Sequence, residues 1–174
     1  KQMGFENNKM KKLNFGCGIK IKEGFVNVDL QKHKGVDKSF DFNKFPYPLK
    51  ADSFELILVD NVLEHLEAPE KVIEELHRIA KNGCLIQIRV PYCKSILSFN
   101  DITHKHHFNR RAIEQIVRGH DSYSYEKKNK FELIKNELRP TRYGKMLPKF
   151  LRKYANYLFN EIHDMIEVEL KVIK

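Results

Sequence analysis

Short apolar runs, separated by glycine, proline and charged residues, predict buried strands along the first half of the chain. The runs lie at 12–15, 25–30, 38–42, 54–60 and 84–90. FELILVD (54–60) and CLIQIRV (84–90) are the longest, and Pro91 is expected to stop the second. Because these two runs are apolar at most positions, we expect them at the centre of a mostly parallel sheet.

A helix is predicted between the two longest runs, because apolar residues recur there at helical spacing. They are Val72, Ile73, Leu76, Ile79 and Ala80. Pro69 occupies a favoured first helical position, and Gly83 is expected to close the helix. NRRAIEQIVRG (109–119) predicts a second helix, with Asn109 as its N-cap.

The last third of the chain predicts two more strands, FELIKNEL (131–138) and EVELKVI (167–173). Between them, apolar residues at helical spacing predict an amphipathic helix over 146–162, within a helical insertion at about 141–163. Strands that alternate with helices, and whose central members are apolar, favour an α/β domain.

Composition and charge narrow the class of protein. The 174 residues, of which 41% are hydrophobic, fit a single domain over 1–174. The sequence shows no apolar run near the roughly 18 residues of a membrane span and no secretion leader, so a cytoplasmic protein is expected. Three cysteines without a C-x-x-C pair predict neither a disulfide framework nor a zinc knuckle. The net charge of +9 attracts polyanions such as nucleic acid or acidic lipid.

The candidate chemistry begins where the first strand runs into Gly16 and Gly18. A glycine turn at this place in an open α/β sheet lets the backbone approach a ligand closely. The nicotinamide-dinucleotide fingerprint needs a third glycine, which would fall at Ile21, and an acid about 20 residues further on, and the chain has neither. Asp29, at the end of the second strand, can instead accept hydrogen bonds from two vicinal ribose hydroxyls. A nucleoside without a pyrophosphate therefore stays open as a ligand.

Residues 12 to 110 resemble the class I S-adenosylmethionine-dependent methyltransferases, especially their small type 11-like group. The resemblance rests on LNFGCG (13–18), VNVDL (26–30), DFNKFPYPLKADSFELILVD (41–60) and NVLEHL (61–66), in this order. A glycine pair alone is a weak signal, but the ordered set is specific because each piece falls at the expected strand end. The resemblance implies a Rossmann-like, doubly wound, mostly parallel sheet with an antiparallel last strand, and S-adenosyl-L-methionine as the cofactor.

The same resemblance implies which residues hold the cofactor. We expect the glycine turn to wrap the methionine part of the cofactor with Phe15, Gly16, Cys17 and Gly18. The end of the second strand is expected to hold the ribose with Asp29 and to flank the adenine with Leu30, while Asp41 and Phe42 contact the adenine. The end of the fourth strand is expected to lie beside the sulfonium with Asp60, Asn61 and Val62. Structural alternatives stay open for three of them, a turn-initiating acid for Asp41 and a helix cap for Asp60 and Asn61.

Three histidines are candidate catalytic residues, because an oxygen or neutral-amine nucleophile benefits from a base that titrates near neutral pH. His65 follows the fourth strand, while His104 and His106 lie in DITHKHHFN (101–109). That segment is similar to an Asp-x-Thr-His stretch of the same family. The alternatives are helix packing for His65 and a structural loop for the others. No metal is expected, because the loop lacks a clear set of four ligands and methyl transfer requires none.

The expected activity is methyl transfer to an O or N atom of a small-molecule or glycan-like acceptor. Methylation of a nucleobase amine is disfavoured, because relatives with that activity carry D/N-P-P-Y where this chain reads DNVL (60–63). Two alternatives stay open. An RNA-directed methyltransferase or RNA-binding module is suggested by the net charge and by basic and aromatic residues interleaved over 142–157. The other is a catalytically silent cofactor-binding subunit.

Short connections mark a departure from the family. Residues 19–24 and 31–37 leave room for about one helical turn each, whereas parallel strands are usually joined by a dozen or more residues. One face of the sheet is therefore expected to lose its helical cover. We expect either the 146–162 helix or a second subunit, in a homodimer, to bury that face.

Overall fold

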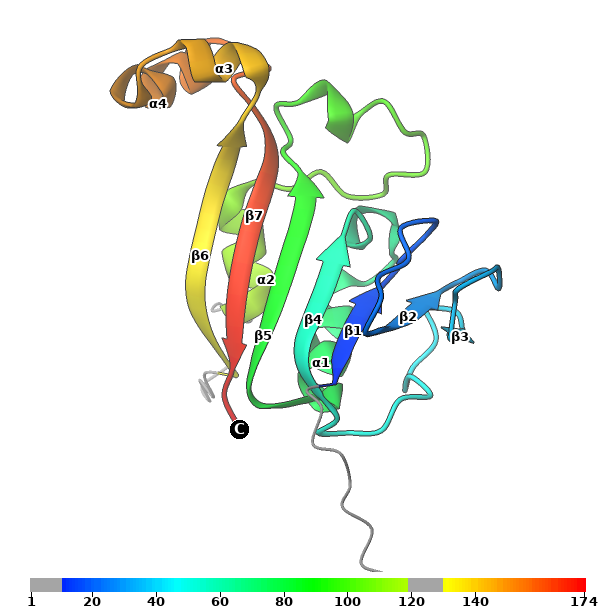
Figure 1. Cartoon of the computed structure of the whole chain (residues 1–174). Helices are drawn as coiled ribbons and strands as arrows, with labels where there is room; N and C mark the ends of the chain where they lie inside the picture. The colour runs from blue at the N-terminus through cyan, green and yellow to red at the C-terminus, as the bar shows by residue number, and fades with distance from the viewer. Residues whose placement is uncertain (1–10, 119–129) are drawn as a thin grey trace, which may run out of the picture.

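The computed structural model describes residues 11–118 and 130–174, which form one seven-stranded sheet in the order β3-β2-β1-β4-β5-β7-β6 (Figure 1). The strands are β1 (Lys12–Phe15), β2 (Phe25–Asp29), β3 (Lys38–Ser39), β4 (Phe54–Asp60), β5 (Ala80–Pro91), β6 (Phe131–Pro140) and β7 (His163–Val172). The first five are parallel, and β7 runs antiparallel to both of its neighbours. The expected α/β fold with an antiparallel last strand is confirmed.

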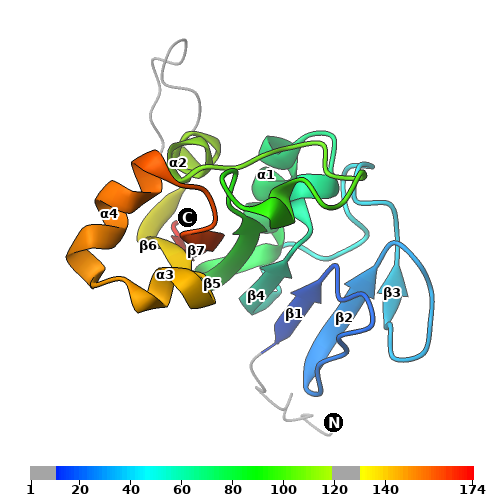
Figure 2. The ribbon, with the colours of Figure 1, turned by 90° about the horizontal axis from the view of Figure 1, so that it is seen from above.

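The helices that complete the core lie on one face of this sheet, as the view from above shows (Figure 2). The helical elements are η1 (Leu63–His65), α1 (Pro69–Ile79), η2 (Ile96–Ser98), α2 (Arg110–Arg118), α3 (Arg142–Met146) and α4 (Lys149–Leu158). Leu76 of α1 and Ile113 of α2 close over Ile57, Ile86 and Ile166 of the central strands. Each such buried side chain contributes about 1.5 to 3 kcal/mol. Among the described residues, no helix is long and apolar enough to cross a membrane.

The predicted starts of α1 and α2 are confirmed, but α1 ends earlier than expected. Pro69 is the first residue of α1, and the Asn109 side chain accepts a hydrogen bond from Ala112 N at 2.8 Å as an N-cap. Gly83 was expected to close α1, yet the helix stops at Ile79. Ala80 already pairs with Phe54 of β4, so the chain passes directly from helix to strand.

The third predicted strand, 38–42, is also shorter in the structure, because β3 comprises only Lys38 and Ser39. Phe40 and Phe42 instead pack against Tyr47, with ring centroids 5.2 and 6.3 Å away. The strand β3 therefore ends where this aromatic cluster begins.

The helix predicted over 146–162 is divided in two. Leu147 is extended, with ψ of 139°, and Pro148 follows it, so α3 ends before this pair and α4 begins after it. Proline disfavours a helical conformation in the residue before it, which explains the break. In Figure 1, α3 and α4 project beyond the upper ends of β6 and β7, away from β1 and β2. The expectation that this helix covers the bare sheet face is therefore wrong.

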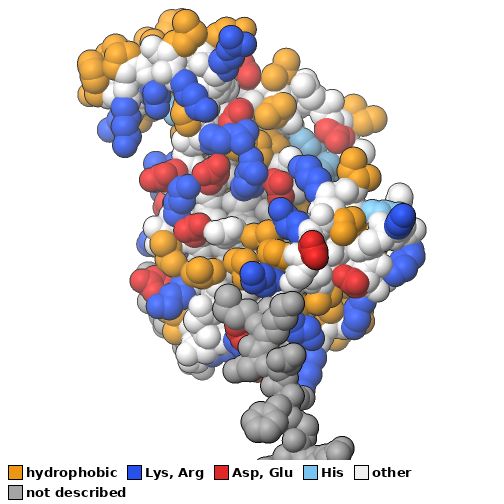
Figure 3. Space-filling model, viewed as in Figure 1, with side chains coloured by type: hydrophobic (Ala, Val, Ile, Leu, Met, Phe, Trp, Pro, Cys, Tyr) orange, Lys and Arg blue, Asp and Glu red, His pale blue; other side chains and the backbone are white. Residues whose placement is uncertain are grey.

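The second face of the sheet carries no helical layer among the described residues, as expected from the short connections, and Figure 3 shows it from the front. Polar pairs line it: Gln87 donates to Glu169 at 2.8 Å, and Lys135 lies 2.8 Å from Glu167. Because these side chains are polar, this face of β5, β6 and β7 can be exposed to solvent. A homodimer that covers the part nearer to β1 stays a prediction.

Candidate functional site

The site lies where the order of the parallel strands reverses, at the carboxyl ends of β1 and β4. Phe15 of β1 stands opposite Val28 of β2 and Val59 of β4. The residues that follow these positions therefore meet at one edge of the sheet, which is the usual ligand position in open α/β sheets.

Gly16 is needed for both conformation and space. Its φ is +67°, and a Cβ on it would lie 2.3 Å from Cγ2 of Val62. The N–H groups of Gly16 and Cys17 both donate to the carbonyl of Val28, at 2.9 and 3.0 Å. These contacts hold the turn between Val28 of β2 and Val62. Gly18, at φ +48°, has no atom within 4 Å of the corresponding position, so the chain is open there.

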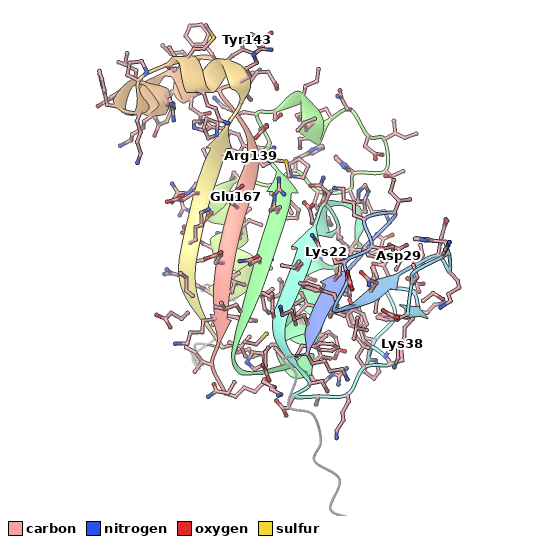
Figure 4. All side chains as sticks on the ribbon, viewed as in Figure 1. Lys22, Asp29, Lys38, Arg139, Tyr143 and Glu167 are labelled. Carbon is pink, nitrogen blue, oxygen red and sulfur yellow. The ribbon has the colours of Figure 1, made fainter. Side chains whose placement is uncertain are left out.

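Asp29 closes the turn from the other side. Its Oδ2 accepts a hydrogen bond from Gly18 N at 2.7 Å, and its Oδ1 accepts one from Gln31 N at 3.1 Å (labelled in Figure 4). A carboxylate has about four lone-pair sites, and two are used here. The remaining two can accept hydrogen bonds from a diol. The carboxylate and the open glycine therefore form a fitting place for a ribose and the chain attached to it.

The end of β4 supplies an acid with basic neighbours. Asp60 lies 3.4 Å from Lys20 Nζ and 3.8 Å from Arg89, with its carboxylate about one-third exposed. Asn61 adopts a positive φ of +56°, and its N–H donates to the carbonyl of Arg89. Val62 is buried beneath Gly16. The structure therefore gives Val62 a packing role and leaves Asp60 facing the site.

The aromatic candidates lie inside the protein. Phe15 and Phe42 are buried and stacked, with ring centroids 4.1 Å apart. Cys17 is buried too, which raises the pKa of its thiol. Only the backbone of these residues is therefore available to a ligand in this conformation, and their predicted contacts with the cofactor remain predictions.

The two other adenine candidates lie at the surface. Leu30 is exposed beside Asp29. Asp41 accepts a hydrogen bond from Asn43 N at 2.9 Å and pairs with Lys44, contacts typical of a turn-initiating acid. The predicted adenine contacts of Asp41 and Leu30 stay predictions.

Two of the candidate histidines come together. The rings of His65 and His104 lie 4.7 Å apart, centroid to centroid. His104 Nδ1 donates to the carbonyl of Ser98 at 2.9 Å, so its Nε2 is left as an acceptor. His65 Nδ1 lies 2.9 Å from the hydroxyl of Thr103, which itself donates to Asp101. The hydroxyl can therefore only accept a hydrogen bond from His65 Nδ1. In both rings Nδ1 carries the proton and Nε2 is the acceptor.

Burial and the neighbouring His104 favour the neutral form of His65. Burial lowers the pKa of His65, and the neighbouring His104 lowers it further. His106 lies apart from this pair in its contacts: its ring faces Phe108 at 6.0 Å, and its Nε2 is buried without a hydrogen-bond partner. The pair His65 and His104 therefore has the geometry of a base, while the catalytic role predicted for His106 stays a prediction.

Glu64 is a residue that the sequence reasoning missed. Its side chain is 1% exposed and neither carboxylate oxygen has a hydrogen-bond partner, so burial raises its pKa to about 7. Glu64, His65 and His104 each offer one ligand atom, all within 4.8 Å of one another. These three can approach a divalent cation, although structural sites usually have four protein ligands. The signal was an acid in NVLEHL, a segment in which four of the six residues are apolar or amide.

The methyltransferase domain family Methyltransf_11 matches residues 9–88 of the chain. This stretch contains the glycine turn, Asp29, and the end of β4. The match supports a class I S-adenosylmethionine-dependent methyltransferase family for this part of the chain. S-adenosylmethionine is accordingly the cofactor that the methyltransferase domain implies, and the geometry around Gly18 and Asp29 fits it. His104 and His106 lie outside the matched residues.

Solved structures agree with the methyltransferase fold. An S-adenosylmethionine-dependent methyltransferase from Archaeoglobus fulgidus matches with a TM-score of 0.64 at 15% identity, over 94% of this chain and 86% of that one. A putative methyltransferase from Bacillus halodurans C-125 has a TM-score of 0.64 at 11% identity, over 94% and 93%. The [4+2]-cyclase SpnF has a TM-score of 0.61 at 11% identity, over 94% and 74%. No curated protein matches significantly. At these identities the structures show the fold alone.

Proposed function

We propose that this methyltransferase moves a methyl group from S-adenosylmethionine to an oxygen or nitrogen atom of a small-molecule or glycan-like acceptor. The observation that carries the proposal is the pair His65 and His104, two imidazoles whose Nε2 atoms are free to accept a proton. Such a base is useful to a hydroxyl or amine nucleophile and unnecessary for a thiolate.

The glycine turn and Asp29 hold the cofactor in this proposal. The open backbone at Gly18 takes the amino-acid part, while Asp29 accepts from the ribose hydroxyls with its two free lone-pair sites. When bound, the cofactor supplies an electrophilic methyl carbon on a sulfonium. The remaining candidates Leu30, Asp41 and Phe42 are assigned to the adenine.

The histidine pair receives the acceptor's proton. Nε2 of His104 would accept the proton of the acceptor's oxygen or nitrogen atom as that atom is methylated. His65, 4.7 Å away between ring centroids, limits where the acceptor can lie. Holding the nucleophile in line with the methyl carbon supplies most of the rate in such a displacement.

The test is methyl incorporation from labelled cofactor into pools of hydroxylated, amino and glycan-like small molecules. His104→Gln should lower turnover about 10²- to 10⁴-fold, while cofactor affinity in calorimetry stays unchanged. His77→Gln, at a half-buried position on α1 where the ring contacts the carbonyl of Ile173, is the matched control. Tight cofactor binding without incorporation into any pool would favour the catalytically silent subunit.

RNA as the acceptor remains the alternative suggested by the net charge of +9. It predicts incorporation into RNA and binding that weakens steeply as the salt concentration rises. Incorporation into RNA and not into the small-molecule pools would replace the proposal.

A further inference from the structure

The helix α4 is amphipathic, but its apolar side faces solvent and its more polar side faces the protein. Its half-buried residues are Arg152, Ala155 and Asn156, whereas Phe150 and Leu158 are 70% and 79% exposed. In a helix on the surface of a water-soluble domain, the apolar stripe usually faces the core. Here that stripe faces outward, and none of the helix's residues is fully buried.

Hydrogen bonds hold the helix in this orientation. Arg152 Nε donates to the carbonyl of Leu147 at 2.9 Å, and Asn156 Nδ2 donates to the hydroxyl of Tyr92 at 2.9 Å. Lys94 Nζ donates to the carbonyl of Asn156 at 2.7 Å. The Arg152 bond is local to the α3–α4 connection, whereas the Asn156 bonds attach the polar side of α4 to Tyr92 and Lys94 and leave the apolar side chains facing away.

The exposed apolar surface extends beyond α4. Tyr143 and Met146 of α3 are exposed at the same end of the molecule, and Figure 4 shows Tyr143 pointing away from the sheet. The loop around η2 adds Phe99 and Ile102, the second of which is 98% exposed. Backbone and side-chain bonds between Glu161 and the segment 94–96 join the loop to the end of α4. Figure 3 shows apolar side chains along this upper edge.

The charge of the helical part of this surface is of one sign, whereas the loop 96–102 carries one acid, Asp101. The segment 142–158 contains five basic residues and no acidic one. The basic residues are Arg142, Lys145, Lys149, Arg152 and Lys153. Exposed aromatic and aliphatic side chains flanked by lysines are typical of helices that lie in the interface of an anionic membrane.

We propose that α3, α4 and the loop 96–102, together the docking surface, bind the surface of an anionic lipid bilayer. Two observations favour lipid over other partners. A second copy of the chain joined through the same patch would bring cations against cations, because both sides of a two-fold contact are identical. RNA would pair with the cations and stack on the aromatic rings, but Met146, Leu158 and Ile102 would gain nothing from it. A bilayer accepts both the apolar and the basic side chains.

The test is co-sedimentation of the full chain with phosphatidylcholine vesicles, with and without phosphatidylglycerol. We expect binding to the anionic vesicles only. Phe150→Ser combined with Leu158→Ser should abolish it, while Ile134→Ser, at an exposed position on β6, should not. All these side chains are exposed, so thermal unfolding should be unchanged and serves as the folding control.

Charge is tested separately. Lys149→Glu combined with Lys153→Glu should weaken binding to the anionic vesicles by at least about 25-fold, since each basic residue contributes about fivefold near an anionic surface. Lys50→Glu combined with Lys71→Glu makes the same change in net charge at exposed positions elsewhere and should weaken it far less.

Three results would overturn the proposal. They are no sedimentation with either vesicle, a concentration-dependent dimer that the Phe150 and Leu158 variants dissociate without lipid, and RNA binding that these variants abolish while vesicle binding stays absent. None of these measurements depends on methyl transfer, so the docking surface and the proposed activity fail independently.

Discussion

The Asp29 carboxylate fixes the glycine turn through Gly18 N, and in the proposed function its remaining lone pairs accept from the ribose. Its spacing from the glycines was sufficient to select it from the sequence. Glu64 was not selected, because its importance depends on burial that NVLEHL does not reveal and on the approach of His104, forty residues later in the chain. Contacts of this kind form only when the loop 101–109 folds over η1.

Replacing Asp29 by alanine should weaken cofactor binding. The ribose hydroxyls would lose their acceptor, at a cost of about 1 to 3 kcal/mol. Calorimetry with S-adenosylhomocysteine measures this, and Asp41→Ala provides a comparison for the adenine contact. An Asp29→Ala protein that keeps full affinity would contradict the ribose assignment.

The buried acid Glu64 should make stability depend on pH. Its pKa is raised to about 7 in the folded protein, so the folded state binds more protons than the unfolded state between about pH 4.5 and 7. This residue's contribution therefore becomes less favourable as the pH rises through that range, by an amount on the order of 3 kcal/mol.

Glu64→Gln removes this titration without changing the shape of the side chain. The variant should gain stability relative to the parent at pH 8 and much less at pH 5, as measured by urea unfolding at both values. An equal difference at the two pH values would show that Glu64 does not titrate in this range.

At the scale of elements, the strands with the strongest apolar pattern were predicted well and the packing of the others was not. The runs 54–60 and 84–90 are central strands, and the apolar side chains on one face of each are buried against the helices. In contrast, 38–42 contains a strand of only two residues, and the aromatic rings that follow it pack against Tyr47, a contact that the sequence pattern does not reveal. The 146–162 helix is divided at Pro148, and its position against the sheet depended on contacts that periodicity does not specify.

The turn between β1 and β2 offers a comparison of two glycines. Gly16→Ala should cost about 2 to 4 kcal/mol, because it combines a positive φ with a clash against Val62. Gly18→Ala has the same conformational cost without the clash, so about 1 kcal/mol is expected. Urea unfolding measures both. Val62→Ala should relieve part of the Gly16→Ala cost, and additive effects of the two changes would argue against the clash.

At the scale of the molecule, the glycine turn, the histidine pair and the docking surface all lie toward the end where the parallel strands terminate (Figure 1). The fold itself does not specify the reaction, since a [4+2]-cyclase shares it. The assignment of methyl transfer therefore rests on the family match and on the side chains at that end, and the acceptor is tested by incorporation.

The flank formed by β2 and β3 is held by few contacts, since β3 pairs through two residues only and both of them are exposed. Local opening should therefore require little free energy there, and the amide hydrogens of β2 should exchange with deuterium sooner than those of β4 and β5. A nucleoside that bridges Asp29 and the turn would brace this flank. Deuterium uptake at 25–29 should then fall as ligand is added, which makes the weakest edge of the sheet the most sensitive reporter of occupancy.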